Sequence, residues 1–131
     1  MYTPPGTPRS RSLVRFTMRV SLPHFGQAVD FVVSMSEHRR AELGYWLGVP
    51  YWGKGYATEA SQEILRFGFE TLKLRRIYAS YVTENPTSGR VLEKIGMRYE
   101  GILRSHICKW DVFHDLVFYG ILHDEFRARS S

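Results

Sequence analysis

Two glycines, Gly53 and Gly55, stand just before a segment whose apolar residues recur at helical spacing. Glycines one residue apart let the backbone turn tightly, and the N–H groups at a helix start point toward one spot where the helix dipole favours an anion. The stretch Tyr51–Ala60 therefore predicts a seat for a phosphate group. An ordinary loop-to-helix turn explains the same two glycines equally well, so the prediction depends on the neighbouring segments.

The other reactive side chains are scattered along the chain. His106, His114 and His123 lack the tight spacing of metal ligands, so we predict no metal site. The single cysteine, Cys108, excludes an internal disulfide and a cysteine-based zinc cluster. We expect Cys108 to be a small buried or half-buried strand residue rather than a catalytic thiol.

The composition is typical of one small globular domain. The chain has 131 residues, of which 44% are hydrophobic and 15% aromatic, enough for a packed core. No run of about 18 apolar residues occurs, and the N-terminus lacks the apolar block of a secretory signal. We therefore expect a single folded domain over residues 13–131 that does not enter a membrane and resides in the cytoplasm.

The positive charge is concentrated at the N-terminus. The net charge is +5, of which the first 29 residues carry +4 and the rest of the chain +1. Residues 1–12 are rich in Pro, Gly, Ser and Thr without apolar periodicity, so we predict a disordered basic leader. Because the remaining body is nearly neutral, we expect nucleic acid as a partner only through this leader.

The elements that must position the glycine turn begin with three predicted strands. Apolar and polar residues alternate over 13–22 and again over 29–35, which indicates strands with one buried face. A third strand is expected over 41–49, ended by Pro50. The three strands are predicted to form an antiparallel meander.

A helix, a strand, a second helix and a hairpin are expected to follow. Apolar residues at helical spacing predict a helix from Ala57 to about Leu72, and 76–82 reads as a buried strand. Asn85-Pro86 is a typical helix start and Gly96 a typical helix end. Two strands over 98–108 and 113–122, joined by a turn at Lys109–Asp111, are expected to finish the chain. The fold class is therefore α/β, with a mixed sheet.

Three segments in a fixed order carry a family resemblance. They are the Glu42 strand with Gly44–Leu47, the glycine turn opening a helix, and Asn85–Ser88 opening another helix that ends in Glu93–Met97. The order of these segments and their residue types closely resemble those of the GNAT superfamily of acyl-CoA N-acyltransferases, and within it the RimJ/RimL-type ribosomal-protein N-terminal acetyltransferases. The resemblance covers roughly residues 37–126. It implies a GNAT-like fold.

The resemblance implies that acetyl-CoA is the donor and that no metal takes part. The family signature Gln/Arg-x-x-Gly-x-Gly/Ala corresponds to Trp52–Ala57, where the final four positions fit and Trp52 replaces the usual polar residue. The residues that would hold the pyrophosphate, mainly through backbone N–H groups, are Trp52, Gly53, Lys54, Gly55, Tyr56, Ala57 and Thr58.

The pantetheine arm of the coenzyme would pass between two strands that splay apart in the family, the Glu42 strand and the 76–82 strand. Leu47 and Val49 would pair their backbone with its amides, as an added strand does. Asn85 would hydrogen-bond the arm from the other side, although a local helix cap explains this residue as well.

Acyl transfer to an amine needs a base for the ammonium proton, donors for a tetrahedral oxyanion and a proton for the leaving thiolate. By the resemblance, Glu42 is the general base, directly or through a water; a solvated strand carboxylate is the alternative. A backbone N–H near Leu47 would meet the oxyanion. Ser88 would lie near the sulfur and supply the last proton, or it is an ordinary first-turn helix residue.

The identity of the residue that protonates the thiolate stays open, because this chain differs from many superfamily members at one position. Many members carry a tyrosine seven residues after the asparagine. This chain has Leu92 there instead, and this departure matches the RimJ/RimL branch. Tyr81 is a second candidate acid, with a core residue as the alternative. Asp111 and Asp115 could line the acceptor pocket, but a turn and a solvated face explain them as well.

A larger difference from the family pattern lies at the N-terminus. The family ordinarily begins with a strand and one or two helices before the meander, whereas about 12 unpatterned residues precede the first strand here. We therefore expect these elements to be missing and the acceptor side of the cleft to be incomplete or completed by a partner chain. The open sheet edge that results would favour a homodimer.

The expected function is that of an acetyl-CoA-dependent N-acetyltransferase acting on a primary amine, with a protein N-terminal amine as the expected acceptor. A small amine such as a polyamine is the alternative acceptor. Two rival functions stay open: a non-catalytic acyl-CoA-binding module, and an RNA-associated protein that uses its basic leader.

Overall fold

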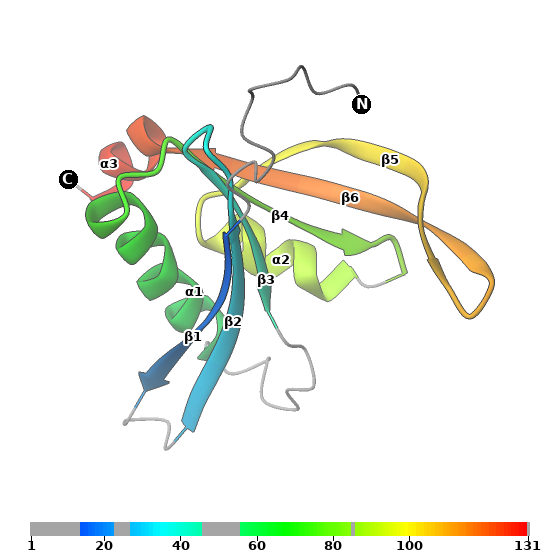
Figure 1. Ribbon diagram of the computed structural model, residues 1–131, viewed down its shortest axis with the longest axis horizontal. Coiled ribbons are helices and arrows are strands. Elements are labelled where there is room, and N and C mark those ends of the chain that lie inside the picture. The colour runs from blue at the N-terminus through cyan, green and yellow to red at the C-terminus, as the bar shows by residue number, and fades with distance from the viewer. Residues whose placement is uncertain (1–13, 23–26, 46–55, 85, 131) are drawn as a thin grey trace, which may run out of the picture.

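A six-stranded mixed sheet with helices on one face forms the described part of the chain, residues 14–22, 27–45, 56–84 and 86–130 of the computed structural model (Figure 1). The strand order is β1-β2-β3-β4-β6-β5. In chain order the elements are β1 Val14–Leu22, β2 Gln27–Met35, β3 Arg40–Tyr45, α1 Tyr56–Arg66, the π-helical η3 Phe67–Thr71, β4 Arg76–Val82, α2 Pro86–Lys94, β5 Arg98–Lys109, β6 Val112–Leu122 and α3 His123–Ser130.

The predicted meander is confirmed as far as Tyr45, while the last predicted residues of the third strand, 46–49, and Pro50 lie outside the described residues. β1 pairs antiparallel with β2 from Val14↔Met35 to Leu22↔Gln27, and β2 pairs antiparallel with β3. Phe16, Met18 and Val20 contact the core, whereas the residues between them are exposed. This alternation explains why the period-two pattern was sufficient to predict the strand.

The rest of the predicted sheet is also confirmed. β4 lies parallel to β3 and antiparallel to β6, so the sheet is mixed. Its helix-facing residues Ile77 and Ala79 are buried. α2 ends as predicted before Gly96, whose φ of +99° glycine adopts without steric cost. β5 and β6 form a hairpin whose turn, Trp110-Asp111, has positive φ at both residues, the geometry of a tight two-residue turn.

The prediction for Cys108 was wrong, because this residue is exposed on β5. Its partner across the hairpin, Phe113, is 65% exposed, and Trp110 at the tip is 93% exposed. This end of the hairpin extends away from the helices (Figure 1), so no described element covers either face of it.

The predicted helix from Ala57 to Leu72 has the expected extent but changes type. After α1 the chain widens into η3, where the N–H of Leu72 donates to the carbonyl of Phe67 at 3.1 Å, five residues back. Within η3, Gly68 packs against β4 so closely that a Cβ there would lie 2.6 Å from Ile77 Cδ1. The apolar spacing alone could not distinguish the two helix types.

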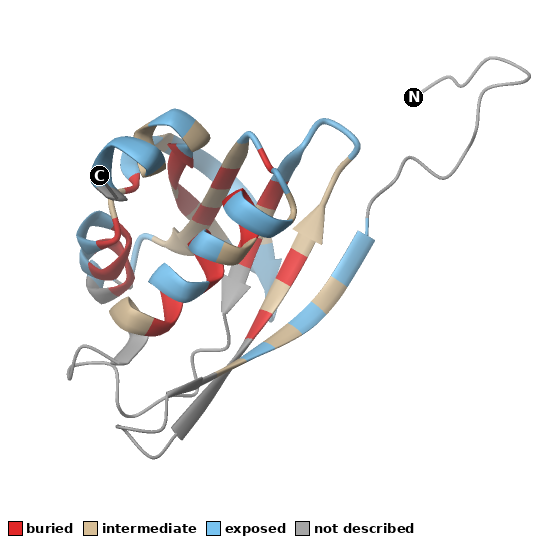
Figure 2. Cartoon of the chain, turned by 90° about the vertical axis from the view of Figure 1, so that its left-hand side faces the viewer, coloured by how far each residue is buried: buried red, intermediate tan, exposed pale blue. Residues whose placement is uncertain are grey.

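The prediction that the hairpin ends the chain was wrong, because α3 follows β6 directly. Phe126 of α3 packs on Phe69 of η3, with ring centroids 5.1 Å apart. α1, α2 and α3 all contribute to one apolar core against the same face of the sheet (Figure 2). Within the described residues the opposite face is bare. No described helix is long and apolar enough to cross a membrane.

Candidate active site

The parallel strands β3 and β4 separate partway along their length. They are paired at three positions, Arg40 with Arg76, Ala41 with Ile77, and Glu42 with Tyr78. Beyond this point β3 continues to Tyr45 beside β2 and β4 continues to Val82 beside β6, with no further pair between β3 and β4 in the described residues. The two strands therefore open into a split at their C-terminal ends (Figure 1).

Glu42 occupies the last paired position before the split. Its neighbours Ala41 and Leu43 are buried against the helices, so the half-buried Glu42 side chain projects toward the bare face. Within the described part of the chain, the Glu42 carboxylate has no hydrogen-bond or ion-pair partner. With respect to the described residues, it is thus an available acceptor group at the point where the split begins.

Both helices that follow the split begin at the same edge of the sheet. The chain leaves β3 to enter α1 and leaves β4 to enter α2, and the carboxyl ends of parallel strands share one edge. The positive ends of two helix dipoles therefore face this edge. Such an arrangement suits the negatively charged phosphates of a nucleotide-like ligand.

Most of the predicted coenzyme residues lie outside the described residues, namely Leu47, Val49, Trp52, Gly53, Lys54, Gly55 and Asn85. The backbone of Tyr56 and Ala57 forms the first turn of α1, and Thr58 follows half-buried in the same turn. The helix thus starts directly after the two glycines, where the phosphate seat was predicted. The roles of these residues stay predictions.

The candidate proton donors lie on the helix side of β4. Ser88 is in the first turn of α2 and only 4% exposed, while Leu92 is a core residue with no exposed surface. Tyr81 reaches the same helix: a Cβ on Gly89 would overlap its hydroxyl group. The structure therefore brings Ser88 and Tyr81 to neighbouring positions, and leaves both as candidates.

Tyr81 also belongs to a partly buried hydrogen-bonded group. Its ring lies 6.0 Å from the ring of Tyr119, whose hydroxyl donates to Glu93 Oε2 at 3.1 Å. Burial raises the pKa of Tyr119 well above the usual value, and the hydrogen bonds with Glu93 and Tyr81 raise it further. Tyr119 therefore stays protonated as a donor, and it helps to fix Tyr81 beside α2.

Replacing Tyr119 by phenylalanine is expected to remove a pH dependence of stability in alkali. The raised pKa means that the folded state holds this proton more tightly than the unfolded state. Its stabilisation is complete below about pH 10 and is lost above, at up to about 1.4 kcal/mol per pH unit. The difference in unfolding free energy between wild type and Tyr119→Phe, measured by urea denaturation at pH 8 to 11.5, should shrink as the pH rises.

The control for this prediction is Tyr99→Phe, because Tyr99 is 58% exposed on β5. The difference in unfolding free energy between wild type and Tyr99→Phe is measured over the same pH range. A difference for Tyr119→Phe that changes with pH no more than that of Tyr99→Phe would contradict the role assigned to its burial.

A contact that the sequence did not predict lies beyond the end of β4. Nδ1 of His114 lies 3.2 Å from Oε2 of Glu84, two residues after β4 ends. The pKa of Glu84 is lowered by a hydrogen bond from its own backbone N–H and by His114. Asp115, a predicted acceptor-pocket residue, instead accepts a hydrogen bond from the Ser105 N–H at 2.7 Å and holds the bulge in β5.

The remaining predicted residues do not gather at the split. Asp111 lies exposed at the hairpin tip, the His106 ring meets Phe118 edge-on at 6.0 Å, and His123 lies against Phe69. In the part of the chain that the structure describes, no group of three or more His, Cys, Asp and Glu side chains could hold a metal ion.

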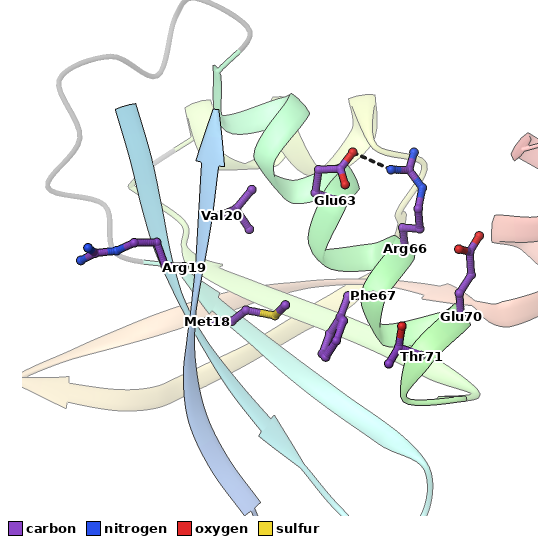
Figure 3. A pocket seen from close by; sticks show the side chains of 8 residues that line it. All are labelled: Met18, Arg19, Val20, Glu63, Arg66, Phe67, Glu70 and Thr71. Atoms are coloured by element: carbon purple, nitrogen blue, oxygen red, sulfur yellow. Dashed lines mark hydrogen bonds and ion pairs between the residues drawn. The ribbon is translucent and has the colours of Figure 1, made fainter. Parts of the chain in front are cut away.

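A groove of about 360 Å³ runs between β1 and the α1–η3 segment (Figure 3). Met18 and Val20 point into it from the strand and Phe67 from the helix, while Glu63 and Arg66 form an ion pair at its rim. None of the predicted site residues lines this groove. The split between β3 and β4 is therefore the better candidate for the active site.

Comparison with known families and structures agrees with this geometry. A family model described as an acetyltransferase (GNAT) domain matches residues 21–98, more than half of the chain. A crystal structure of an acetyltransferase of the GNAT family from Bacillus anthracis is 38% identical, with a TM-score of 0.67 over 73% of this chain and 58% of that chain.

Two curated relatives come from Bacillus subtilis (strain 168). The uncharacterized N-acetyltransferase YnaD is 44% identical over 84 residues, covering 64% of this chain and 49% of the relative. The putative ribosomal N-acetyltransferase YdaF is 36% identical over 93 residues, covering 71% of this chain and 51% of the relative. This chain thus spans about half the length of the curated relatives it matches.

Proposed function

Because the chain belongs to the GNAT acetyltransferase family, we propose that it transfers the acetyl group of acetyl-CoA to a protein N-terminal amine. The observation that carries the proposal is the split after Glu42↔Tyr78, with an unpartnered carboxylate at its start among the described residues. The likeness to a putative ribosomal N-acetyltransferase supports the RimJ/RimL branch and its acceptor class. A cytoplasmic location and a homodimer stay predictions.

The start of α1 and the split offer complementary halves of a coenzyme site. The α1 N-terminus would hold the pyrophosphate, and the separated strands leave backbone groups of β3 and β4 free for the amides of the pantetheine arm. When bound, acetyl-CoA supplies the activated acyl group as a thioester.

The residues around the split could then serve the transfer of the acyl group. Glu42, on the bare face, takes the proton from the acceptor ammonium, directly or through a water, so that the nitrogen lone pair can attack the thioester carbonyl. A C–N bond forms, the C–S bond breaks, and the attacking nitrogen releases its second proton to water. Ser88 or Tyr81, on the helix side, returns a proton to the thiolate. The acceptor would approach from the bare face, where no described helix blocks an extended peptide.

The proposal is tested by calorimetry with acetyl-CoA and by a thiol-release assay with three acceptors. These are a peptide with a free N-terminus, the same peptide with its N-terminus blocked, and spermidine. We expect binding tighter than about 1 mM and thiol release with the free peptide only. Binding without release from any acceptor would favour the non-catalytic module, and release with spermidine alone would favour the small-amine alternative. Absence of binding would contradict the proposal as a whole.

A further inference from the structure

A basic pocket lies at the end of the sheet opposite the split. Its volume is about 290 Å³, and it is lined by Arg39, Lys73, Leu74, Arg75 and His123. These residues come from the β2–β3 turn, the turn between η3 and β4, and the start of α3, which meet at one end of the molecule (Figure 1). We call this site the basic pocket.

The wall of the basic pocket is cross-linked by hydrogen bonds. The Arg39 guanidinium donates from Nε and Nη2 to the Lys73 carbonyl at 3.2 and 2.8 Å. The backbone N–H of Arg75 donates to the Arg39 carbonyl at 2.7 Å, and that of His123 donates to the Arg75 carbonyl at 2.9 Å. A guanidinium carries five N–H donors, so Arg39 is held in place with donors left over for a ligand.

Positive charge exceeds negative charge at this pocket. Asp124 contributes a carboxylate, 3.4 Å from Arg75 Nη1 and 3.6 Å from His123 Nδ1. Among the described residues, the Lys73 ammonium has no hydrogen-bond or ion-pair partner, and neither has the guanidinium of Arg40, the next residue after Arg39. Unneutralised cations around a concave surface attract anions and raise their local concentration.

The backbone at the pocket is unusual for the residues that occupy it. Arg39 has φ of 58° and Lys73 φ of 57°, the left-handed region that glycine or asparagine enters at lower cost. The backbone conformation itself therefore does not favour arginine or lysine, although the Arg39 side chain ties its turn to the Lys73 carbonyl. What they add is a pair of cationic side chains on the same pocket.

We propose that the basic pocket binds the phosphate backbone of a nucleic acid. The cations lie on three separate segments, which fits a ligand with several phosphates better than a single small anion. The lining holds no Phe, Tyr or Trp ring on which a base could stack, and the half-buried His123 ring is engaged in an edge contact with the buried Phe69. Binding is therefore independent of base sequence.

This proposal revises the expectation that only the leader could meet nucleic acid. Within the nearly neutral body, Arg39, Arg40, Lys73 and Arg75 lie together at the N-terminal ends of β3 and β4, with Asp124 beside Arg75. The leader arginines Arg9 and Arg11 precede Val14, which pairs with Met35 next to the β2–β3 turn. The leader is thus attached to the fold near the basic pocket, and its contribution must be measured separately.

The test measures fluorescence anisotropy of a labelled 15-nucleotide poly(U) RNA between 50 and 300 mM KCl. We expect the logarithm of the binding constant to fall linearly with that of the salt concentration, with a slope near −2 for about three phosphates. Lys73→Asn should weaken binding about 3- to 10-fold and reduce the slope by about 0.7. Because asparagine tolerates the left-handed region, the melting temperature should not fall.

The matched control is Arg104→Gln, which removes one exposed positive charge at the β5 bulge and should change affinity less than about twofold. Saturating coenzyme A should leave RNA binding unchanged, because the split is at the other end of β4. The proposal is overturned if wild type does not bind RNA at 50 mM KCl, or if deletion of residues 1–12 abolishes binding that Lys73→Asn leaves intact. Displacement by coenzyme A, or by millimolar AMP at constant ionic strength, would overturn it too.

Discussion

Glu42→Gln is expected to lower kcat about 10²- to 10⁴-fold while changing the Kd for acetyl-CoA less than about twofold. The amide keeps the size of the side chain but cannot take the proton of the acceptor ammonium. Since Glu42 projects to the bare face, on the side of the sheet away from α1, the coenzyme seat should be unaffected. Steady-state thiol release and calorimetry on the same preparation measure the two quantities.

Glu70→Gln is the control for this change. Glu70 is an exposed carboxylate on η3, on the helix side of the sheet, so its neutralisation should leave both kcat and Kd unchanged. Equal losses of turnover and coenzyme affinity in Glu42→Gln would assign Glu42 a structural role. Unchanged turnover would mean that another group, or bulk water, takes the proton.

The position of Glu42 shows how much of the site could be predicted from the sequence. The sequence pattern predicted a strand through Glu42, and in the structure Ala41 and Leu43 are buried on one face of this strand while Glu42 lies half-buried on the other. The pattern contains no information about where β3 and β4 stop pairing. That depends on how β2 and β6 draw the two strands apart, which is a property of the whole sheet.

The same limit explains the elements that the sequence analysis missed. β4 was predicted with its exact bounds because its apolar run is bordered by polar residues. In the π-helical turn Gly68 packs closely against Ile77, and the short α3 is held by Phe126 against the core rather than by a strong apolar stripe of its own. Neither contact is visible in local spacing.

The surroundings of two further side chains, Glu84 and Cys108, could not be predicted from the sequence either. The Glu84–His114 contact joins residues 30 positions apart that become neighbours only because β4 pairs with β6. Cys108 has the sequence context of a strand residue, and it lies in β5 as expected. Its exposure follows from the hairpin extending past the helices, which the alternation of residues in the strand could not predict.

Phe69→Ala is expected to lower the free energy of unfolding by about 3–5 kcal/mol, the largest stability effect we predict for one side chain. Phe69 is 1% exposed and contacts two aromatic partners from the last helix, Phe126 at 5.1 Å and His123 at 5.7 Å between ring centroids. Its removal leaves a cavity under α3 and takes away the surface on which that helix rests. Urea denaturation followed by circular dichroism measures the loss.

Phe67→Ala is the matched control, two residues earlier in the same π-helical turn. Phe67 is half-buried beside Met18 in the groove along β1, so part of the space left by its truncation is open to solvent (Figure 3). We expect a loss of about 1–2 kcal/mol. A double-mutant cycle of Phe69→Ala with Phe126→Ala should give a coupling energy of about 0.5–3 kcal/mol, because the rings touch. Equal losses at Phe67 and Phe69, or additive effects in the cycle, would show that α3 does not depend on this contact.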